Sequence, residues 1–115
     1  MKSGIVFNQG DILIVPFPFS DLTSIRQRPV LVLSKKEYNE KCEDIITCGI
    51  TSNIKESSYS VLIENLNLSE GKIPIKSRIK VDKLFTLNKS IVIKKLAKVN
   101  NLTFEGVKKE LFKLI

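Results

Sequence analysis

Short runs of strand-forming residues recur along the chain between turn and loop signals, and this spacing constrains the fold more than any other feature. About five to seven such runs precede one amphipathic helix at the C-terminus, without βαβ alternation. This order favours a mainly β fold with one C-terminal α-helix, arranged as a small half-open antiparallel barrel. The predicted strands cover residues 12–15, 29–33, 45–51, 58–64, 76–82, 84–87 and 91–96.

The segments between the strands have signals of their own. Residues 20–28 are polar and predict an exposed loop, 35–41 predicts a short helix, and a loop is expected around Gly71. Asn101 or Thr103 can supply the N-cap of the C-terminal helix. The apolar positions of that helix fall on one face, which we expect to face the core: Phe104, Val107, Leu111, Leu114 and Ile115.

The length and composition fit one domain. A chain of 115 residues, 43% of them hydrophobic, can bury one modest core, and no linker-like stretch divides it. We therefore expect a single domain over residues 1–115. No apolar run reaches membrane-spanning length, and the first residues lack the apolar segment of a signal peptide. These features predict a soluble, cytoplasmic protein that does not contact a membrane.

The chain contains no histidine, and this absence restricts its chemistry. It excludes Ser-His-Asp and Cys-His nucleophile systems and histidine-based metal motifs. Cys42 and Cys48 have a spacing that does not match a zinc site, and we expect both to be small apolar fillers. Only four Asp residues are present, without a pair of the kind that holds magnesium. We predict no metal and no cofactor, so catalysis would depend on Arg, Lys, hydroxyl groups and a few carboxylates.

The formal net charge of +7 indicates a polyanionic partner, although a solvated lysine-rich surface would give the same number. Sixteen lysines accompany only three arginines, Arg26, Arg28 and Arg78. Where lysine is the usual cation, an arginine suggests a need for its planar fork, which binds phosphate through two parallel hydrogen bonds.

Two short motifs can place such chemistry at the rim of the barrel. Arg28 stands directly before Pro29, at the expected end of a loop and the start of a buried strand, so the scaffold would fix its guanidinium group. It could instead only cap the barrel end through backbone carbonyls. The sequence Thr51-Ser52-Asn53 ends another apolar strand and would offer two hydroxyls to a phosphate, or it could simply form a turn.

A third motif alternates polar and apolar residues over 77–82. Alternation places Ser77, Ile79 and Val81 on one side of a strand, and the charged residues on the other. Two cations and one carboxylate could form a phosphate cradle with a proton acceptor, or a solvated face with an ion pair. The charged residues are Arg78, Lys80 and Asp82.

In order and spacing, these motifs resemble the MazF/PemK family, the toxins of bacterial and archaeal toxin–antitoxin pairs. The resemblance extends from about residue 10 to the terminal helix. It rests on Gly10-Asp11 before ILIVPF, Arg28-Pro29 before VLVLS, Ile50-Thr51-Ser52, the stretch from Ser77 to Asp82, and Thr86.

The resemblance implies a fold, an activity and partners. The fold would be the SH3-like half-open barrel of the plasmid-maintenance toxins, assembled as a homodimer. The activity would be metal-independent, sequence-specific cleavage of single-stranded RNA to 2′,3′-cyclic phosphate and 5′-hydroxyl ends, which inhibits translation and growth. The partner would be a small acidic antitoxin whose disordered segment folds onto the basic groove.

The resemblance also assigns roles by position. Arg28 matches the family arginine that stabilises the transition state and acts as a general acid, and Thr51 matches the threonine that orients the scissile phosphate. Asp82 matches an acidic residue that helps activate the 2′-hydroxyl in some members. The other residues expected to contact RNA belong to the same motifs or to the first loop: Ser52, Asn53, Arg26, Phe19, Ser77, Arg78 and Lys80.

Some positions depart from the family pattern. The loop over 20–27 lacks the Gly-x-Glu-Gln sequence of several members, so it offers no glutamate base. Lys80 stands where some members have a second arginine, and Phe85 replaces a frequent arginine. Four aromatic residues are candidates for base stacking, with Phe19 preferred and Phe17 assigned to the core; the others are Tyr38 and Phe85.

Two other classes of function remain open from the sequence. One is a binding protein on the same barrel, either a CcdB-like topoisomerase poison or an RNA-binding module without catalysis. The other is a structural SH3-like module of a larger assembly. Only the enzyme requires Arg28 and Thr51 together at one rim of the barrel.

Overall fold

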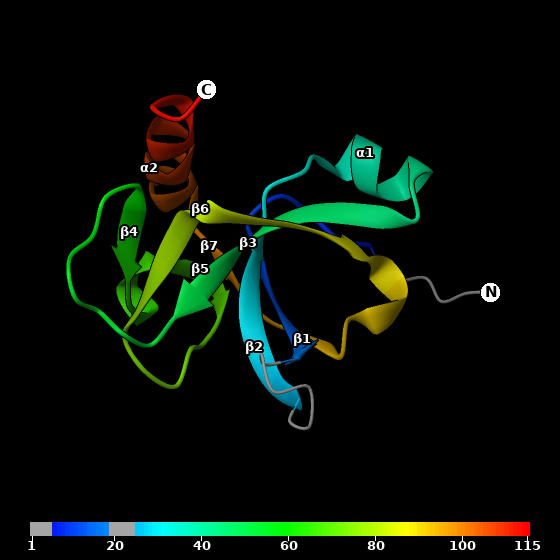
Figure 1. The fold of residues 1–115 in the computed structure, drawn as a ribbon, viewed down its shortest axis with the longest axis horizontal. Coiled ribbons are helices and arrows are strands. Elements are labelled where there is room, and N and C mark those ends of the chain that lie inside the picture. Colours follow the sequence, from blue (N-terminus) through cyan, green and yellow to red (C-terminus); the bar gives the residue numbers. More distant parts are fainter. Residues whose placement is uncertain (1–5, 19–24) are drawn as a thin grey trace.

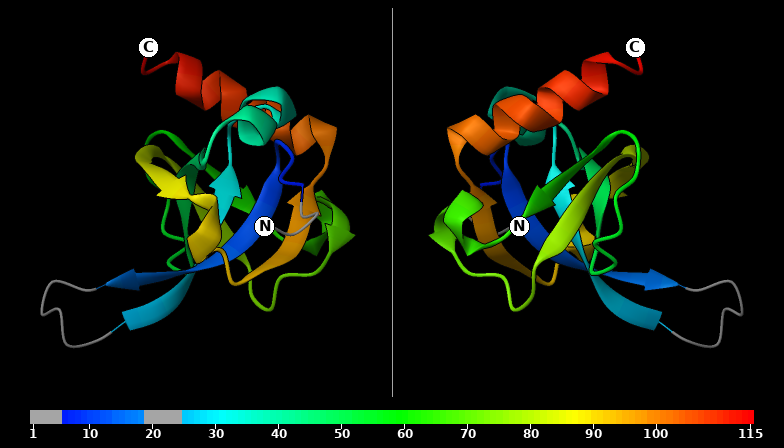
Figure 2. Two further views of the ribbon diagram at one scale, coloured as in Figure 1. Left: turned by 90° about the vertical axis from the view of Figure 1, so that its right-hand side faces the viewer. Right: turned by 90° about the vertical axis from the view of Figure 1, so that its left-hand side faces the viewer.

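The computed structural model describes residues 6–18 and 25–115 of the chain. Seven strands form one antiparallel sheet in the order β4-β6-β3-β2-β1-β7-β5. The sheet curls into a half-open barrel with both α-helices at one end, and the β1–β2 hairpin extends beyond it as an arm (Figures 1 and 2). The strands are β1 (Asp11–Pro18), β2 (Ile25–Val32), β3 (Asp44–Thr51), β4 (Ser60–Ile63), β5 (Leu68–Gly71), β6 (Ser77–Asn88) and β7 (Lys94–Val99).

Two α-helices and two short 3-10 helices complete the described structure. Helix α1 (Lys36–Lys41) follows β2, and α2 (Asn101–Phe112) ends the chain. The 3-10 helices are η1 (Asn65–Asn67) and η2 (Lys89–Ile91). The predicted class, a mainly β half-open barrel with a C-terminal helix, is confirmed.

The sheet has a hydrophobic core on each face, because successive side chains of a strand point to opposite sides. Ile12 and Leu31 belong to one cluster, which includes Phe104 and Val107 of α2. Their strand neighbours belong to the second, smaller cluster, which consists of Phe7, Leu13, Val15, Val30, Val32 and Ile45. Alternation along β1 and β2 therefore supplies both cores at once.

Two segments expected as loops are strands in the structure. Residues 25–28 pair with β1, and Arg28 lies opposite Val15 within the ladder instead of at the end of a loop. The region of Gly71 forms β5, which pairs with β7. Gly71 has a φ of 71°, and an added Cβ would clash with the carbonyl oxygen of Leu96. These polar segments form strands because a neighbouring strand supplies hydrogen-bond partners, which local composition does not reveal.

The last strands also differ from the prediction. The expected strands 76–82 and 84–87 are one continuous strand, β6, with a shift in register along it. The strand expected at 91–96 begins later, at Lys94, because Asn88 caps η2. The Asn88 side chain accepts a hydrogen bond of 2.9 Å from the backbone N–H of Ser90, which continues the turn before β7 begins.

Helix α2 begins one residue earlier than expected. Its N-cap is Asn100, whose side chain accepts a hydrogen bond from the backbone N–H of Thr103 at 2.9 Å. The predicted inward face is correct for Phe104 and Val107, which are buried. It is wrong for Leu114 and Ile115, which follow the helix and are 38% and 86% exposed.

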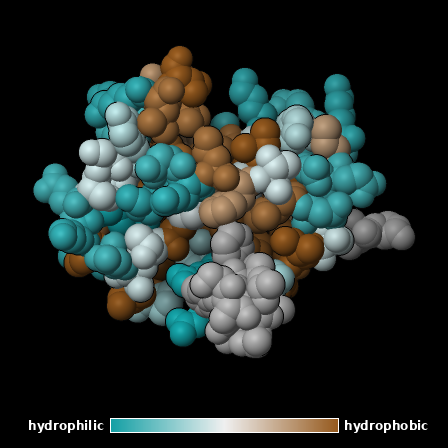
Figure 3. Space-filling view, viewed as in Figure 1, coloured by the Kyte–Doolittle hydropathy of each residue, from teal (hydrophilic) through white to brown (hydrophobic). Residues whose placement is uncertain are grey.

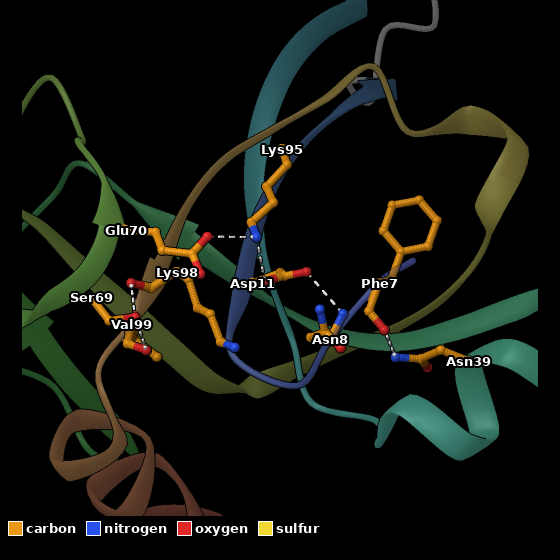
Figure 4. A network of polar contacts seen from close by, with 9 residues as sticks. All are labelled: Phe7, Asn8, Asp11, Asn39, Ser69, Glu70, Lys95, Lys98 and Val99. Atoms are coloured by element: carbon orange, nitrogen blue, oxygen red, sulfur yellow. Dashed lines mark hydrogen bonds and ion pairs between the residues drawn. The ribbon is translucent and has the colours of Figure 1, made fainter. Parts of the chain in front are cut away.

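A network of ion pairs around a buried carboxylate connects β1, β7 and β5 (Figure 4). Asp11 is fully buried, and its Oδ2 accepts a hydrogen bond of 2.8 Å from the backbone N–H of Asn8. Its Oδ1 lies 3.3 Å from Nζ of Lys95, which lies 2.9 Å from Oε1 of Glu70. Ionic contacts thus join β1, β7 and β5.

The charges of this network shift the pKa values of its members. Partial burial alone would lower the pKa of Lys95, but hydrogen bonding to Glu70 and the two nearby carboxylates raise it overall. The hydrogen bond from Lys95 and its positive charge lower the pKa of Glu70. Each charge therefore favours the ionised form of its neighbour.

Candidate functional site

A cavity of about 800 Å³ lies where β2, β3 and β6 meet the loop over residues 52–59. β3 lies between the other two strands in the sheet, so its residues form the floor. The lining residues are Arg28, Pro29, Val30, Gly49, Ile50, Thr51, Asn53, Lys55, Glu56, Ser57, Lys80, Lys83 and Phe85.

Strand register brings Arg28 and Thr51 to this cavity. Val30 and Lys80 both lie opposite Gly49, one on each side of β3. Arg28 is two residues beyond Val30, and Thr51 is two residues beyond Gly49 in the antiparallel direction. Since side chains two residues apart share a face, both occupy the next row of the same face. Both are half-buried, so the scaffold holds each without removing it from solvent.

The lining of the cavity is strongly cationic and partly apolar. It includes four cations and a single carboxylate, Glu56. Its apolar residues include Val30, Ile50 and Phe85. Positive charge over a partly apolar surface suits a ligand with both phosphate groups and flat bases. The four cations are Arg28, Lys55, Lys80 and Lys83.

Two cations of β6 hold the loop over 52–59 in place. Nε and Nη2 of Arg78 donate to the carbonyl oxygen of Ile54 at 3.3 and 3.2 Å, and Nη1 donates to Oγ of Ser60 at 3.1 Å. Nζ of Lys80 donates to Oγ of Ser57 at 2.8 Å. Arg78 does not line the cavity and instead fixes the loop that does.

The start of the loop depends on Thr51. Its Oγ1 accepts a hydrogen bond of 3.1 Å from the backbone N–H of Asn53, and Oδ1 of Asn53 accepts one of 3.1 Å from the N–H of Lys55. The Thr51 hydroxyl hydrogen is not used in that contact and can be donated to a ligand. Of the three residues that the sequence singled out here, Thr51 and Asn53 line this cavity and Ser52 does not.

A register shift in β6 separates Lys80 from Asp82. Gly49 lies opposite Lys80 while its neighbour Cys48 lies opposite Leu84, so β6 has Val81, Asp82 and Lys83 between the two partners. The shift allows Lys80, Lys83 and Phe85 all to line the cavity, whereas Asp82 is exposed and is not among the lining residues. The alternation predicted over 77–82 is present, but the cradle of Arg78, Lys80 and Asp82 does not form.

Cys48 has a strongly perturbed thiol. Burial raises the pKa of the Cys48 thiol to about 12, and the charge of Asp82 adds to the increase. Cys48 belongs to the core cluster that contains Ile12, on the face opposite Val30. As expected from the sequence, Cys48 is a buried filler; Cys42 is partly exposed, and both are free thiols.

A second cavity, of about 430 Å³, shares Arg28, Pro29 and Ile50 with the first. It contains Ser52 and Ser77, which the sequence grouped with Thr51 and Arg78. Because neighbouring residues point to opposite faces, Ser52 and Ser77 lie in this second cavity, whereas Thr51 lines the first and Arg78 lines neither. Its other lining residues are Ile12, Ile14, Arg26, Gln27, Ile73, Pro74, Ile75, Lys94 and Leu96.

The structure thus divides the predicted site. Arg28, Thr51, Asn53 and Lys80 line the first cavity, whereas Arg26, Ser52 and Ser77 line the second with Arg28. Phe19 lies outside the described residues, as does the side chain of Phe17. Tyr38 lies on α1 and lines neither cavity, whereas Phe85 lines the first.

Sequence reasoning missed four polar lining residues, Lys55, Glu56, Ser57 and Lys83. The first three belong to a loop without periodicity, and the fourth lies within the register shift. The only signal was their position directly after Thr51-Ser52-Asn53, in a polar stretch before the next strand.

Membrane-spanning helices and groups of metal-binding side chains are absent from residues 6–18 and 25–115. No helix within these ranges is both long and apolar enough to span a membrane. Within them, no three His, Cys, Asp or Glu side chains are grouped so that they could hold a metal ion.

Fold and cavity together define a class: a small half-open β-barrel with a C-terminal helix and a cationic cavity suited to a polyanion. A search of curated proteins finds no match to the sequence. A family model described as the PemK-like, MazF-like toxin of type II toxin–antitoxin systems matches residues 8–115. The chain therefore belongs to the PemK/MazF toxin family.

Solved structures of low sequence identity share the fold. A MazE–MazF structure (Form-III) from Deinococcus radiodurans is 21% identical, with a TM-score of 0.78 and coverage of 96% of each chain. An endoribonuclease from a mycobacterial species is 16% identical, with a TM-score of 0.76, covering 97% of this chain and 93% of that one. A mycobacterial endoribonuclease in complex with its cognate antitoxin is 17% identical, with a TM-score of 0.75 and coverage of 92% and 91%.

Proposed function

We propose that this chain is a metal-independent endoribonuclease toxin that cleaves single-stranded RNA at specific sequences. The observation that supports this most is the placement of Arg28 and Thr51, from separate strands, in one cationic cavity. Membership of the PemK/MazF family supports it as well. Two proteins of the same fold are named endoribonucleases.

The proposed reaction uses the substrate's own 2′-hydroxyl as the nucleophile. Its oxygen attacks the adjacent phosphorus, and the bond to the 5′-oxygen breaks, which leaves 2′,3′-cyclic phosphate and 5′-hydroxyl ends. Negative charge accumulates on the non-bridging oxygens in the transition state. A cation fixed beside these oxygens stabilises the transition state more than the substrate, by about 3–4 kcal/mol for one donor.

Arg28 and Lys80 would supply positive charge to the phosphate from opposite sides of β3. Because arginine remains protonated at neutral pH, we assign Arg28 an electrostatic role before that of an acid. The Thr51 hydroxyl would donate to a non-bridging oxygen and orient the phosphate. The proposed RNA path continues across Arg28 to the second cavity, where Arg26, Ser52 and Ser77 lie.

The proposal includes two protein partners and a location. Apolar surface extends from α2 across the middle of one face (Figure 3). Exposed apolar side chains include Leu84 and Phe112, at 49% and 62%. Such surface suits a homodimer contact, and the +7 charge suits an acidic antitoxin. Similar MazE–MazF and toxin–antitoxin structures support the second partner. We place the protein in the cytoplasm, where its RNA substrate lies.

The test is cleavage of a long RNA in the presence of EDTA. Arg28→Ala and Thr51→Ala should each lower the rate at least a hundredfold, because each removes a contact that forms with the transition state. Lys108→Ala on α2 provides a charge-matched control, and circular dichroism verifies folding. Fragments should end in 5′-hydroxyl and 2′,3′-cyclic phosphate groups.

Persistent cutting by both variants would refute the site assignment. Tight RNA binding without any cutting by the unaltered chain would refute the enzyme and favour a binding module. Inhibition of a DNA topoisomerase by a chain that leaves RNA intact would favour the CcdB-like alternative.

A further inference from the structure

Glu56 is the only carboxylate among the residues that line the larger cavity. It lies in the loop over 52–59, and its side chain is exposed. Four cations share the lining with it. A negative charge opposes the binding of a polyanion such as RNA, so the carboxylate of Glu56 does not serve RNA affinity.

The loop holds Glu56 between two anchors. On its N-terminal side, the carbonyl oxygen of Ile54 accepts two hydrogen bonds from Arg78. On its C-terminal side, Oγ of Ser57 accepts a hydrogen bond from Lys80 at 2.8 Å. Ser60 also donates to the carbonyl oxygen of Ser57 at 2.6 Å. Backbone anchored one and two residues away restricts where the carboxylate can lie.

The proposed reaction requires a proton acceptor. Lysine and arginine are protonated at neutral pH, and hydroxyl groups are weak bases, whereas glutamate is ionised. The chain has no histidine. Asp82, the acceptor suggested by the sequence, does not line the cavity. Among the residues that line the larger cavity, Glu56 is thus the only side chain that can act as a base at neutral pH.

We propose that Glu56 accepts the proton of the attacking 2′-hydroxyl, an inference that rests on the proposed ribonuclease function. The proton passes from O2′ to the carboxylate as the O2′–P bond forms. The P–O5′ bond breaks, its electron pair stays on O5′, and a water molecule protonates that oxygen. The hydroxide that remains takes the proton from Glu56, which returns to its ionised form.

Glu56→Gln tests the proposal because the amide keeps the shape of the side chain and loses the base. We expect kcat to fall by about 10²–10⁴-fold, the usual contribution of a general base. RNA affinity should stay the same or increase, because a negative charge has been removed from the cavity. For the unaltered chain, a plot of log kcat against pH should fall with a slope of one on the acid side. This fall should be absent in Glu56→Gln.

The controls separate this role from a structural one. Glu43→Gln makes the same change at an exposed residue outside both cavities and should leave kcat unchanged. Glu56→Asp should retain part of the activity. Thermal unfolding shows whether each variant folds.

Each outcome decides between the possibilities. A Glu56→Gln variant that cuts RNA as fast as the unaltered chain overturns the inference and leaves the proposed function standing. A loss explained by weaker RNA binding, with kcat and its fall on the acid side retained, also overturns it. If the unaltered chain does not cut RNA at all, the proposed function fails and the inference fails with it.

Discussion

At the scale of single residues, burial gives identical side chains different chemistry. Cys48 is fully buried in the core, and burial raises the pKa of its thiol to about 12. Cys42 follows α1 and is partly exposed. Because the thiolate is the reactive form of cysteine, the two thiols should differ in reactivity.

A thiol reagent should therefore label one cysteine of the folded protein. At pH 8, the raised pKa lowers the thiolate fraction of Cys48 about a thousandfold below that of an ordinary thiol. We expect rapid reaction of one thiol in the native protein, none in Cys42→Ser, and two thiols in denaturant. Equal native rates at both positions would contradict the burial of Cys48.

At the scale of elements, the loop over 52–59 depends on β6 for its shape. Arg78 contributes two hydrogen bonds to it and one to Ser60 at the start of β4, and Lys80 contributes one to the loop. The strand thus positions Lys55, Glu56 and Ser57 at the cavity from outside the loop. A change at Arg78 should affect the site although its side chain does not line the cavity.

Arg78→Ala should release this loop. Hydrogen exchange of the loop amides should become faster, while the amides of β3 remain protected. RNA cutting should fall about tenfold, equivalent to about 1.4 kcal/mol, because the loop must be ordered again for each reaction. Arg78→Lys should keep part of the protection of the loop amides and part of the activity. Unchanged exchange in the loop would show that other contacts hold it.

Sequence patterns predicted this region in part. Alternation over 77–82 correctly placed Ser77, Ile79 and Val81 on one side of the strand, and all three are buried, since a period of two depends on the strand alone. The register shift after Lys80 depends on how β6 pairs with β3, and no local pattern encodes it. The same reason explains why Asp82 looked like part of the site and Lys83 did not. Arg28 was identified through its motif, although its place in a ladder was missed.

At the scale of the whole molecule, the sheet has two sides with different tasks. The strands β2, β3 and β6 contribute to the larger cavity, and β1, β7 and β5 form the other half of the sheet. In that half, the buried carboxylate of Asp11 needs a counter-charge from Lys95, because an uncompensated buried charge is costly. Stability and the site can therefore be altered independently.

Lys95→Met should destabilise the fold without direct damage to the larger cavity. Asp11 would lose its cation, at a cost of about 1–3 kcal/mol for a buried group left without a partner. Urea unfolding at pH 7 measures this cost, with Lys94→Met as the exposed control.

The effect should depend on pH in a definite direction. The lowered pKa of Glu70 means that its contribution is complete above its ordinary value of 4.5 and is lost as the pH falls through its folded value. The raised pKa of Lys95 means that its contribution persists below its ordinary value of 10.5 and is lost at higher pH. The difference between variant and parent should shrink in acid, and a constant difference would exclude this network as its source.

The extra residues in β6 have a consequence for how this barrel can diverge. Val81, Asp82 and Lys83 lie between two stretches of β6 that pair regularly with β3, and a change of their number by two would keep the neighbouring side chains on their present faces. Such an insertion or deletion would reshape one wall of the larger cavity while the rest of the sheet keeps its register. Proteins with this barrel could thus acquire new target preferences through a few codon changes while they keep the same fold.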